Sequence, residues 1–323
     1  MKLEKLAPAF QGYLWGGTKL RDVYGKQCDL PKVAESWELS THPAGECRIS
    51  GGEFDGLTLE EYAKRAGNQV LGTNTLAFPR FPVLIKLIDA KDPLSIQVHP
   101  SDEYALKVEG EYGKTELWYV MDCEPGAYLY FGVNRPVTKE EFRRRIQDNT
   151  VLEVLNRVEV HPGDVFFIQG GTIHTIGAGI LICEIQQNSN CTYRVYDYGR
   201  RGADGKPREL HVEKALEVSD FQPSDTSSHS RAPEAVAGGT VQRLGACKYF
   251  AVDRLQVEDE MELEVGADSF ASLLVTQGRG VLEGPENTLE FRPGDSLFLP
   301  AGAGKVRVLG PCTLVKTTVP PQK

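Results

Sequence analysis

The sequence of 323 residues lacks the features of secreted and membrane proteins. No apolar run approaches the length of a membrane span. The first ten residues, MKLEKLAPAF, lack the apolar core of a signal peptide. The seven cysteines are an odd number and none are spaced as Cys-x-x-Cys, so a disulfide framework is not indicated. We therefore expect a cytoplasmic protein with reduced thiols and no membrane partner.

An excess of positive charge is also missing. Lysine and arginine number 36 against 45 aspartates and glutamates, which gives a formal net charge of −9. This balance argues against a general nucleic-acid binder. A small anionic substrate remains compatible with it, because cations gathered in a cleft outweigh a distant net charge.

Helical periodicity is scarce. Two short helices are predicted by capping boxes at Thr58–Glu61 and Thr138–Glu141, each followed by apolar residues at helical spacing. Most of the remaining chain consists of short strands between Gly and Pro turns, which predicts a mainly β protein built as a sandwich or barrel. The predicted strands include residues 47–50, 81–89, 95–99, 116–121, 127–131, 158–160, 165–169 and 181–186.

One internal repeat suggests the architecture. Pro162–His174 aligns without a gap to Pro293–Lys305, 131 residues later (293 minus 162). Pro-Gly-Asp turns are common, so two unrelated hairpins are the alternative. We interpret the repeat as two copies of one β-barrel, of which only the first holds a metal because Lys305 replaces His174. Residues 219–239 are rich in Ser, Pro, Ala and Gly, and they suggest an N-terminal domain over 1–220, a linker over 221–239 and a second barrel over 240–323.

Candidate metal ligands cluster around residues 92–120. The alternation in Ser95-Ile-Gln97-Val-His99 predicts a strand with these three polar side chains on one face. Glu116 begins another predicted strand, and an open catalytic metal site needs a third protein ligand, which His174 can supply. Taken singly, His99 could be a solvent-facing residue at a strand end and Glu116 is uninformative. Together they suit zinc among several divalent metals.

The pattern PGDxxFxxxGxxH at 162–174 resembles the second signature of the cupin superfamily, and Gln97-Val-His99 resembles the first, with Gln in place of the usual His. Further motifs are similar to those of type I mannose-6-phosphate isomerases, in particular the short bacterial form. These motifs are residues 34–38, 82–86, 94–100, 113–119, 171–174, 192–198 and 208–211. The resemblance implies tandem cupin (jelly-roll-like) β-barrels with small helical insertions, the first catalytic and the second degenerate.

The same resemblance implies a metal-dependent aldose–ketose isomerase that interconverts mannose 6-phosphate and fructose 6-phosphate through an enediolate. It implies one zinc per chain on His99, Glu116 and His174, with other divalent metals possible. Gln97 is either a fourth ligand or a substrate contact. Arg194 matches a catalytic position, and because arginine is a poor base we expect it to stabilise negative charge. The alternative for Arg194 is a surface residue paired with Asp197.

The remaining site residues follow from their chemistry. Lys114 and Glu184 are the candidates for proton transfer, and Lys114 should face the same side of its strand as Glu116. Lys86 and Ser95 are candidate phosphate contacts, although Lys86 could instead pair with Asp89. The identity of the general base is left open among these groups.

Two other classes of function are compatible with a cupin fold. One is a non-catalytic sugar-phosphate-binding cupin, and the other is a metal-dependent cupin oxidoreductase such as a dioxygenase. The intact ligand set and Arg194 count against the first, and the sugar-phosphate motifs count against the second. The other four histidines are interpreted as structural or surface residues: His42, His161, His211 and His229.

Overall fold

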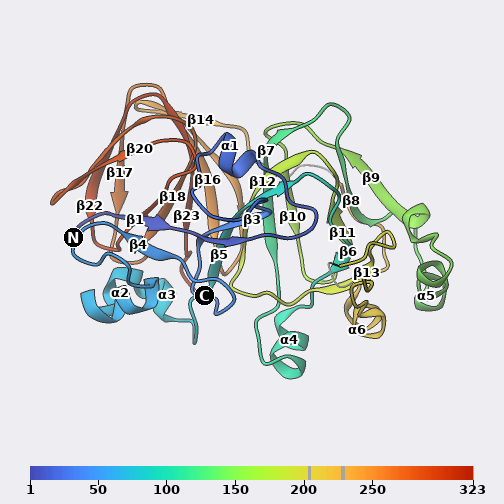
Figure 1. Cartoon of the computed structure of the whole chain (residues 1–323). Coiled ribbons are helices and arrows are strands. Elements are labelled where there is room, and N and C mark those ends of the chain that lie inside the picture. Colours follow the sequence, from blue (N-terminus) through green and yellow to red (C-terminus); the bar gives the residue numbers. More distant parts are fainter. Residues whose placement is uncertain (203–204, 227–229, 323) are drawn as a thin grey trace.

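The computed structural model describes residues 1–202, 205–226 and 230–322. Within these residues the strands form four antiparallel sheets, two in each of two barrels that stand side by side (Figure 1). The predicted mainly β fold with tandem cupin barrels is confirmed. None of the helices in the described part has the length and apolar character that a bilayer crossing requires.

The first barrel is made of a six-stranded and a five-stranded sheet. The six-stranded sheet has the order β10 (Val165–Ile168), β7 (Glu116–Cys123), β12 (Ile180–Gln187), β5 (Val83–Ala90), β3 (Glu35–Leu39), β2 (Ala9–Gln11). The five-stranded sheet has the order β13 (Tyr193–Tyr196), β6 (Ile96–Val98), β11 (His174–Ile176), β8 (Tyr128–Val133), β9 (Leu155–Glu159).

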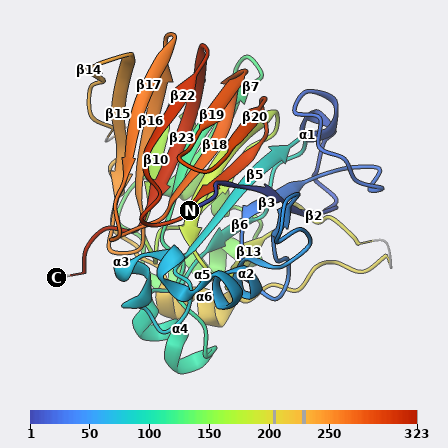
Figure 2. The same cartoon turned by 90° about the vertical axis from the view of Figure 1, so that its left-hand side faces the viewer.

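The second barrel, drawn in orange and red, stands in front in Figure 2. Its larger sheet has the order β14 (Glu234–Val236), β15 (Gly239–Ala246), β16 (Ala251–Val257), β23 (Cys312–Thr318), β18 (Ala271–Gly278), β21 (Ser296–Leu299), β1 (Glu4–Ala7), β4 (Arg48–Ser50). The smaller sheet has the order β17 (Glu260–Val265), β22 (Gly304–Leu309), β19 (Gly280–Glu283), β20 (Thr288–Phe291).

The two Pro-Gly-Asp turns have equivalent hydrogen bonds. The amide of Gly163 donates to the carbonyl of Val120 at 2.8 Å, and the amide of Gly294 donates to the carbonyl of Val275 at 2.8 Å. Both glycines have positive φ, 100° and 89°, a conformation that a side chain would disfavour. The partner residues on β7 and β18 are 155 positions apart (275 minus 120), so these two strands correspond between the two barrels.

The strands of the six-stranded sheet bury both faces, and this explains how the site is placed. On β5, Val83, Ile85 and Leu87 pack into a core shared with Phe250 and Val315 of the second barrel. The alternate residues of β5 therefore face the interior of the first barrel. Lys86, at one of those alternate positions, lines the barrel cavity.

The beginning of the chain is paired with its end. β1 lies between β21 and β4, so residues 4–7 and 48–50 complete the larger sheet of the second barrel. β14 lies inside the segment predicted as a linker and pairs with β15. The division at 220 and 240 remains a prediction.

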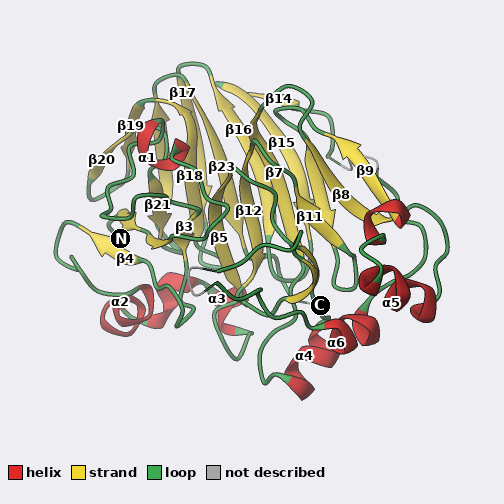
Figure 3. Ribbon diagram, turned by 45° about the vertical axis from the view of Figure 1, so that its right-hand side comes forward, coloured by secondary structure: helices red, strands yellow, loops and turns green. Residues whose placement is uncertain are grey.

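Helices are few and short. α2 (Leu59–Ala66) begins at the predicted capping box on Thr58, and α5 (Lys139–Gln147) begins at Thr138, whose hydroxyl accepts from the amide of Glu141. Figure 3 shows α2, α3, α4, α5 and α6 along one edge of the strands. The helices that the sequence did not predict are α1 (Lys19–Asp22), η1 (Asn68–Leu71), α3 (Thr73–Leu76), α4 (Asp102–Val108), η2 (Val151–Val154) and α6 (Val212–Val218).

Candidate metal centre and active site

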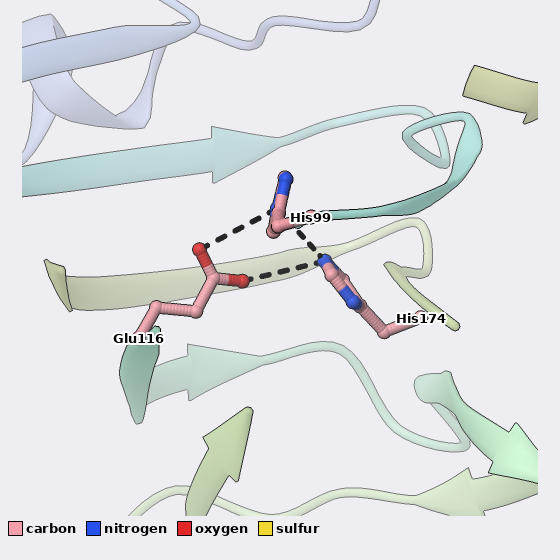
Figure 4. Close-up of side chains that lie close together, drawn as sticks. All are labelled: His99, Glu116 and His174. Atoms are coloured by element: carbon pink, nitrogen blue, oxygen red, sulfur yellow. Dashed lines mark hydrogen bonds and ion pairs between the residues drawn. The ribbon is translucent and has the colours of Figure 1, made fainter. Parts of the chain in front are cut away.

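The three predicted metal ligands come together inside the first barrel. His99 follows β6 directly, Glu116 begins β7 and His174 begins β11, and all three are buried. Their ligand atoms lie within 4.8 Å of one another. Figure 4 shows the three side chains pointing toward a common centre. Because each comes from a different strand, the sheets fix the arrangement without the need for a flexible loop.

Backbone carbonyls orient both imidazoles. Nδ1 of His99 lies 2.9 Å from the carbonyl of Cys191, and Nδ1 of His174 lies 2.8 Å from that of Thr172. A carbonyl only accepts, so each Nδ1 carries a proton and each Nε2 has a free lone pair. The two Nε2 atoms are 3.2 Å apart, and that of His174 is 3.3 Å from Oε1 of Glu116. A hydrogen-bond acceptor on the ring nitrogen that does not face the metal is characteristic of metal-binding histidines.

The electrostatics of the cluster favour a cation. Burial lowers the pKa of His174 to about 4, and burial with the neighbouring Lys114 lowers the pKa of His99 well below its usual value. Burial, with repulsion from Glu184, raises the pKa of Glu116 to about 7 against the opposing effect of Lys114. Oε1 of Glu116 is buried without a hydrogen-bond partner. Neutral imidazoles and an orphaned carboxylate oxygen fit a divalent metal with open coordination positions.

A cavity of about 240 Å³ lies beside the cluster. All six of the other predicted site residues line it: Lys86, Ser95, Gln97, Lys114, Glu184 and Arg194. Gln97 lies on β6 opposite both His174 and Arg194, half-buried, at the boundary between the cluster and the cavity. Other residues of the wall were not predicted from the sequence, among them Tyr13, Trp15, Glu35, Asn190, Thr192 and Arg208.

A chain of buried charges connects the cluster to the cavity. The ammonium of Lys114 contacts the carboxylate of Glu116 and is 3.2 Å from Nε2 of His99. On its other side it lies 3.6 Å from Oε1 of Glu184. The indole of Trp118 donates to Oε2 of Glu184 at 2.9 Å, whereas Oε1 is buried without a hydrogen bond. Glu184 therefore has one oxygen held by a hydrogen bond, and the other lies near the ammonium groups of Lys114 and Lys86.

Lys86 does not pair with Asp89, which was the alternative interpretation. Its ammonium is 3.4 Å from Glu35 and 3.5 Å from Glu184, above the ring of Trp37. The carboxylate of Asp89 instead accepts from the amide of Lys19 at 2.7 Å. Lys86 is thus a cation that lines the cavity.

Arg194 does not pair with Asp197 either. Its Nε donates to the hydroxyl of Ser95 at 3.2 Å and its Nη1 donates to the carbonyl of Glu209 at 2.9 Å. Asp197 is bound by Arg200 and Arg208. The guanidinium of Arg194 therefore lies at the cavity wall as a cation without a carboxylate partner among the described residues.

The remaining histidines have structural or surface positions. His211 accepts from the amide of Arg194 at 3.2 Å and its own amide donates to the carbonyl of Arg194 at 2.7 Å, so it supports that strand. His42 contacts Glu111 at 2.7 Å and lies outside the metal cluster. His161 is exposed, and His229 lies outside the described residues.

A buried His-Glu-His cluster that could hold a metal, beside a charged cavity, defines a cupin with an enzyme-like site. Residues 3–126 match the family model for the catalytic domain of type I phosphomannose isomerase. Residues 240–319 match that for the cupin domain of mannose-6-phosphate isomerase. The chain belongs to the type I phosphomannose isomerase family.

Individual relatives cover almost the whole chain. Mannose-6-phosphate isomerase ManA of Bacillus subtilis is 38% identical over 307 residues, which are 94% of each chain. A crystal structure of the mannose 6-phosphate isomerase from B. subtilis has a TM-score of 0.90 at 35% identity, covering 98% of this chain and 99% of that one. A putative mannosephosphate isomerase from Archaeoglobus fulgidus shares the fold, with a TM-score of 0.78 at 23% identity and 98% coverage of each chain.

Proposed function

We propose that this protein is a zinc-dependent isomerase that interconverts mannose 6-phosphate and fructose 6-phosphate. The observation that carries the proposal is the buried cluster of His99, Glu116 and His174 beside a cavity that holds both acids and bases. The relatives that match the chain along nearly its whole length are named mannose-6-phosphate isomerases. A solved relative with the same fold is described as bound with zinc and yttrium.

One zinc per chain is proposed, with His99, Glu116 and His174 as its ligands. When bound there, a divalent metal polarises a carbonyl or hydroxyl oxygen of the sugar as a Lewis acid. Gln97 lies next to the cluster, and its amide serves either as a further ligand or as a hydrogen-bond partner of the sugar.

The protein residues supply proton transfer. Isomerisation removes the proton from C2 of the aldose and returns a proton to C1. The groups that transfer the proton must therefore lie close to both carbons. Oε1 of Glu184 is buried in the cavity without a hydrogen bond. The ammonium of Lys114 lies 3.6 Å from this oxygen, on the side of the metal cluster. We assign these two residues to proton transfer. Trp118 holds Glu184 in place through its indole nitrogen.

Fixed cations stabilise the negative charges of the substrate and of the enediolate. Arg194 is anchored by two of its nitrogens and has no carboxylate partner within the described residues, so its charge is available. Ser95 and Lys86 line the same cavity and are proposed to contact the phosphate or the sugar hydroxyls. The protein has a negative net charge, so it can bind a small anionic substrate because these cations are gathered in the cavity.

The alternatives are separated by one experiment. The purified protein is assayed with mannose 6-phosphate in a coupled assay, before and after chelation, and after zinc is returned. We expect turnover that chelation abolishes and zinc restores. Binding without turnover in the zinc-loaded protein would support the non-catalytic cupin, and oxygen consumption would support the oxidoreductase. The seven free cysteines suit the cytoplasm that we propose as the place of this reaction.

A further inference from the structure

The second barrel has its own cavity at the position of the catalytic one. It measures about 500 Å³, and its walls include Ser269, Ala271, Lys316 and Thr318. The offset of 155 residues places Ser269 at the position of Lys114 (269 minus 114) and Ala271 at that of the metal ligand Glu116. The second barrel has therefore lost the metal ligand but kept a cavity at this end of its packed interior.

Strand register identifies the counterpart of Glu184. On the first barrel Glu184 lies opposite Trp118, and on the second Lys316 lies opposite Leu273. Trp118 and Leu273 are again 155 positions apart (273 minus 118). Lys316 consequently occupies the position of Glu184, with the opposite charge.

The neighbouring strand shows the same exchange. Lys86 lies opposite Glu184 across β5 and β12, and their charged groups are 3.5 Å apart. Asp253 lies opposite Lys316 across β16 and β23, and their charged groups are 3.3 Å apart. The buried cross-strand ion pair of the catalytic barrel is therefore present in the second barrel with its signs reversed.

A third strand extends the pattern. In the catalytic barrel, Glu35 on β3 contacts Lys86 at 3.4 Å. In the second barrel, Arg243 on β15 contacts Asp253 at 2.5 Å. Across three neighbouring strands the first barrel therefore has Glu35, Lys86 and Glu184. The second barrel has Arg243, Asp253 and Lys316, each with the opposite charge. Two cations share one buried carboxylate, so the floor of the second cavity has an excess of positive charge.

The cavity also has an acidic wall. Glu262, Glu264 and Asp268 line it, and Glu262 binds Lys305 at 2.7 Å. Carboxylates are acceptors for sugar hydroxyls, whereas a guanidinium and an ammonium bind phosphate oxygens. We propose that the C-terminal barrel holds a second, non-catalytic site for a phosphorylated polyol, whose phosphate contacts Arg243 and Lys316.

This site is independent of the isomerase activity, and its cations belong to the second barrel alone. Asp253 keeps one cation when either Arg243 or Lys316 is replaced, so single neutral substitutions should leave the fold intact. Arg279 offers a matched control, because it is an exposed cation of the same barrel that lines a different cavity with no residue in common with this one. Substitution of Arg279 by Gln removes an equal charge without touching the proposed site.

The test is calorimetric titration of the zinc-loaded full-length protein with glucitol 6-phosphate, a hexitol phosphate that cannot isomerise. We expect one binding event in the second barrel in addition to any in the catalytic cavity. Arg243→Gln and Lys316→Gln should each weaken that event about tenfold or more, since each removes a charge-assisted hydrogen bond. Both variants should keep the parent turnover, which shows that they are folded, and Arg279→Gln should bind as the parent does.

Two results would overturn the proposal. The first is binding that is unchanged in both Arg243→Gln and Lys316→Gln. The second is competition by inorganic phosphate with the same affinity as the hexitol phosphate, because the acidic wall would then recognise no hydroxyl group.

Discussion

Nε of Arg194 donates a hydrogen bond to the hydroxyl of Ser95 at 3.2 Å, and this bond joins β13 to the start of β6. The contact fixes the direction of the guanidinium along the cavity wall. Nη1 is held by the carbonyl of Glu209, so Nη2 is the nitrogen that we propose contacts the substrate. A cation that is held in this way needs little reorganisation when charge develops beside it.

Arg194→Ala should therefore lower kcat more than it raises KM. Loss of one preorganised charge-stabilising group typically costs on the order of a hundred- to a thousand-fold in turnover. Steady-state kinetics with mannose 6-phosphate measures this, with zinc content determined alongside. Arg143→Ala, which removes an exposed arginine paired with Glu213, is the matched control and should have parent kinetics. A rise in KM with kcat preserved would assign Arg194 to phosphate binding instead.

Metal content should be one divalent ion per chain. Glu116→Gln removes a direct ligand, and we expect it to weaken zinc binding by more than the roughly ten- to hundred-fold typical of changes in outer partners. Lys305→Ala should leave the zinc content unchanged, because Lys305 is a surface residue of the second barrel. Elemental analysis after dialysis gives both values. Two ions per chain, or an empty site in Lys305→Ala, would contradict the ligand assignment.

Zinc affinity should depend on pH through Glu116. Burial raises the pKa of this carboxyl to about 7 in the metal-free protein, so below that pH a proton must leave before zinc can bind. The pKa of His174, about 4, keeps this imidazole neutral over the same range. Zinc affinity should therefore rise about tenfold per pH unit from pH 5 to 7 and then level off. Competition titrations with a chelator of known pH dependence measure it; a flat profile below pH 7 would show that Glu116 is already ionised.

A buried ion pair ties the two barrels together. The ammonium of Lys26 lies 2.6 Å from the fully buried carboxylate of Glu38 and donates to the carbonyl of Gly294 in the second Pro-Gly-Asp turn. Lys26→Met should lower the free energy of unfolding by about 3–5 kcal/mol, because it leaves a buried charge without its partner. Adding Glu38→Gln should recover part of that loss.

The control for this pair is Lys19→Met. Lys19 binds Asp122 at 2.9 Å on the surface, and loss of such a pair costs about 1 kcal/mol or less. Urea unfolding of the zinc-loaded variants compares them. Equal destabilisation by the two substitutions would show that burial of Glu38 adds nothing.

The period of two in a strand explains why the ligand positions could be foreseen. It places Ser95, Gln97 and His99 on one face, and the structure brings all three to the cluster or its cavity. The same rule argues against the pair Lys86–Asp89, because residues three apart on a strand face opposite sides. That alternative was wrong for a reason already visible in the sequence.

Other features depend on which strands become neighbours, and no local pattern encodes that. Glu35 joins the cavity because β3 lies beside β5, where it can contact Lys86. β1 pairs with β21 although almost the whole chain separates them. The reversed ion pair of Asp253 and Lys316 also emerges only from the register of β16 and β23, since the aligned turn motifs do not contain either residue.

Glu184 is the residue whose role can be tested most sharply. Its Oε2 is held by the indole of Trp118 at 2.9 Å, and its Oε1 is buried in the cavity without a hydrogen bond. Burial raises its pKa, but Lys114 and Lys86 outweigh this effect and the net pKa is lowered, so the group is ionised at neutral pH. An ionised carboxylate with a free oxygen can accept the proton from C2.

Glu184→Gln keeps the size of the side chain and an oxygen for the Trp118 indole, but it removes the base. Turnover should fall about a hundred- to ten-thousand-fold, the usual contribution of general acid–base catalysis. Zinc content should stay at the parent value because Glu184 is not a ligand. Trp118→Phe keeps the carboxylate and an aromatic ring beside His174 but loses the bond that positions Glu184, so its turnover should fall much less and its zinc content should be retained.

Exchange of the C2 proton with solvent deuterium separates the two proton-transfer candidates. If Glu184 takes the C2 proton, Glu184→Gln should abolish both exchange and turnover. If Lys114 takes it, Glu184→Gln should still exchange the C2 proton at a measurable rate while net isomerisation is slow. Near-parent turnover of Glu184→Gln would remove this residue from the catalytic assignment altogether.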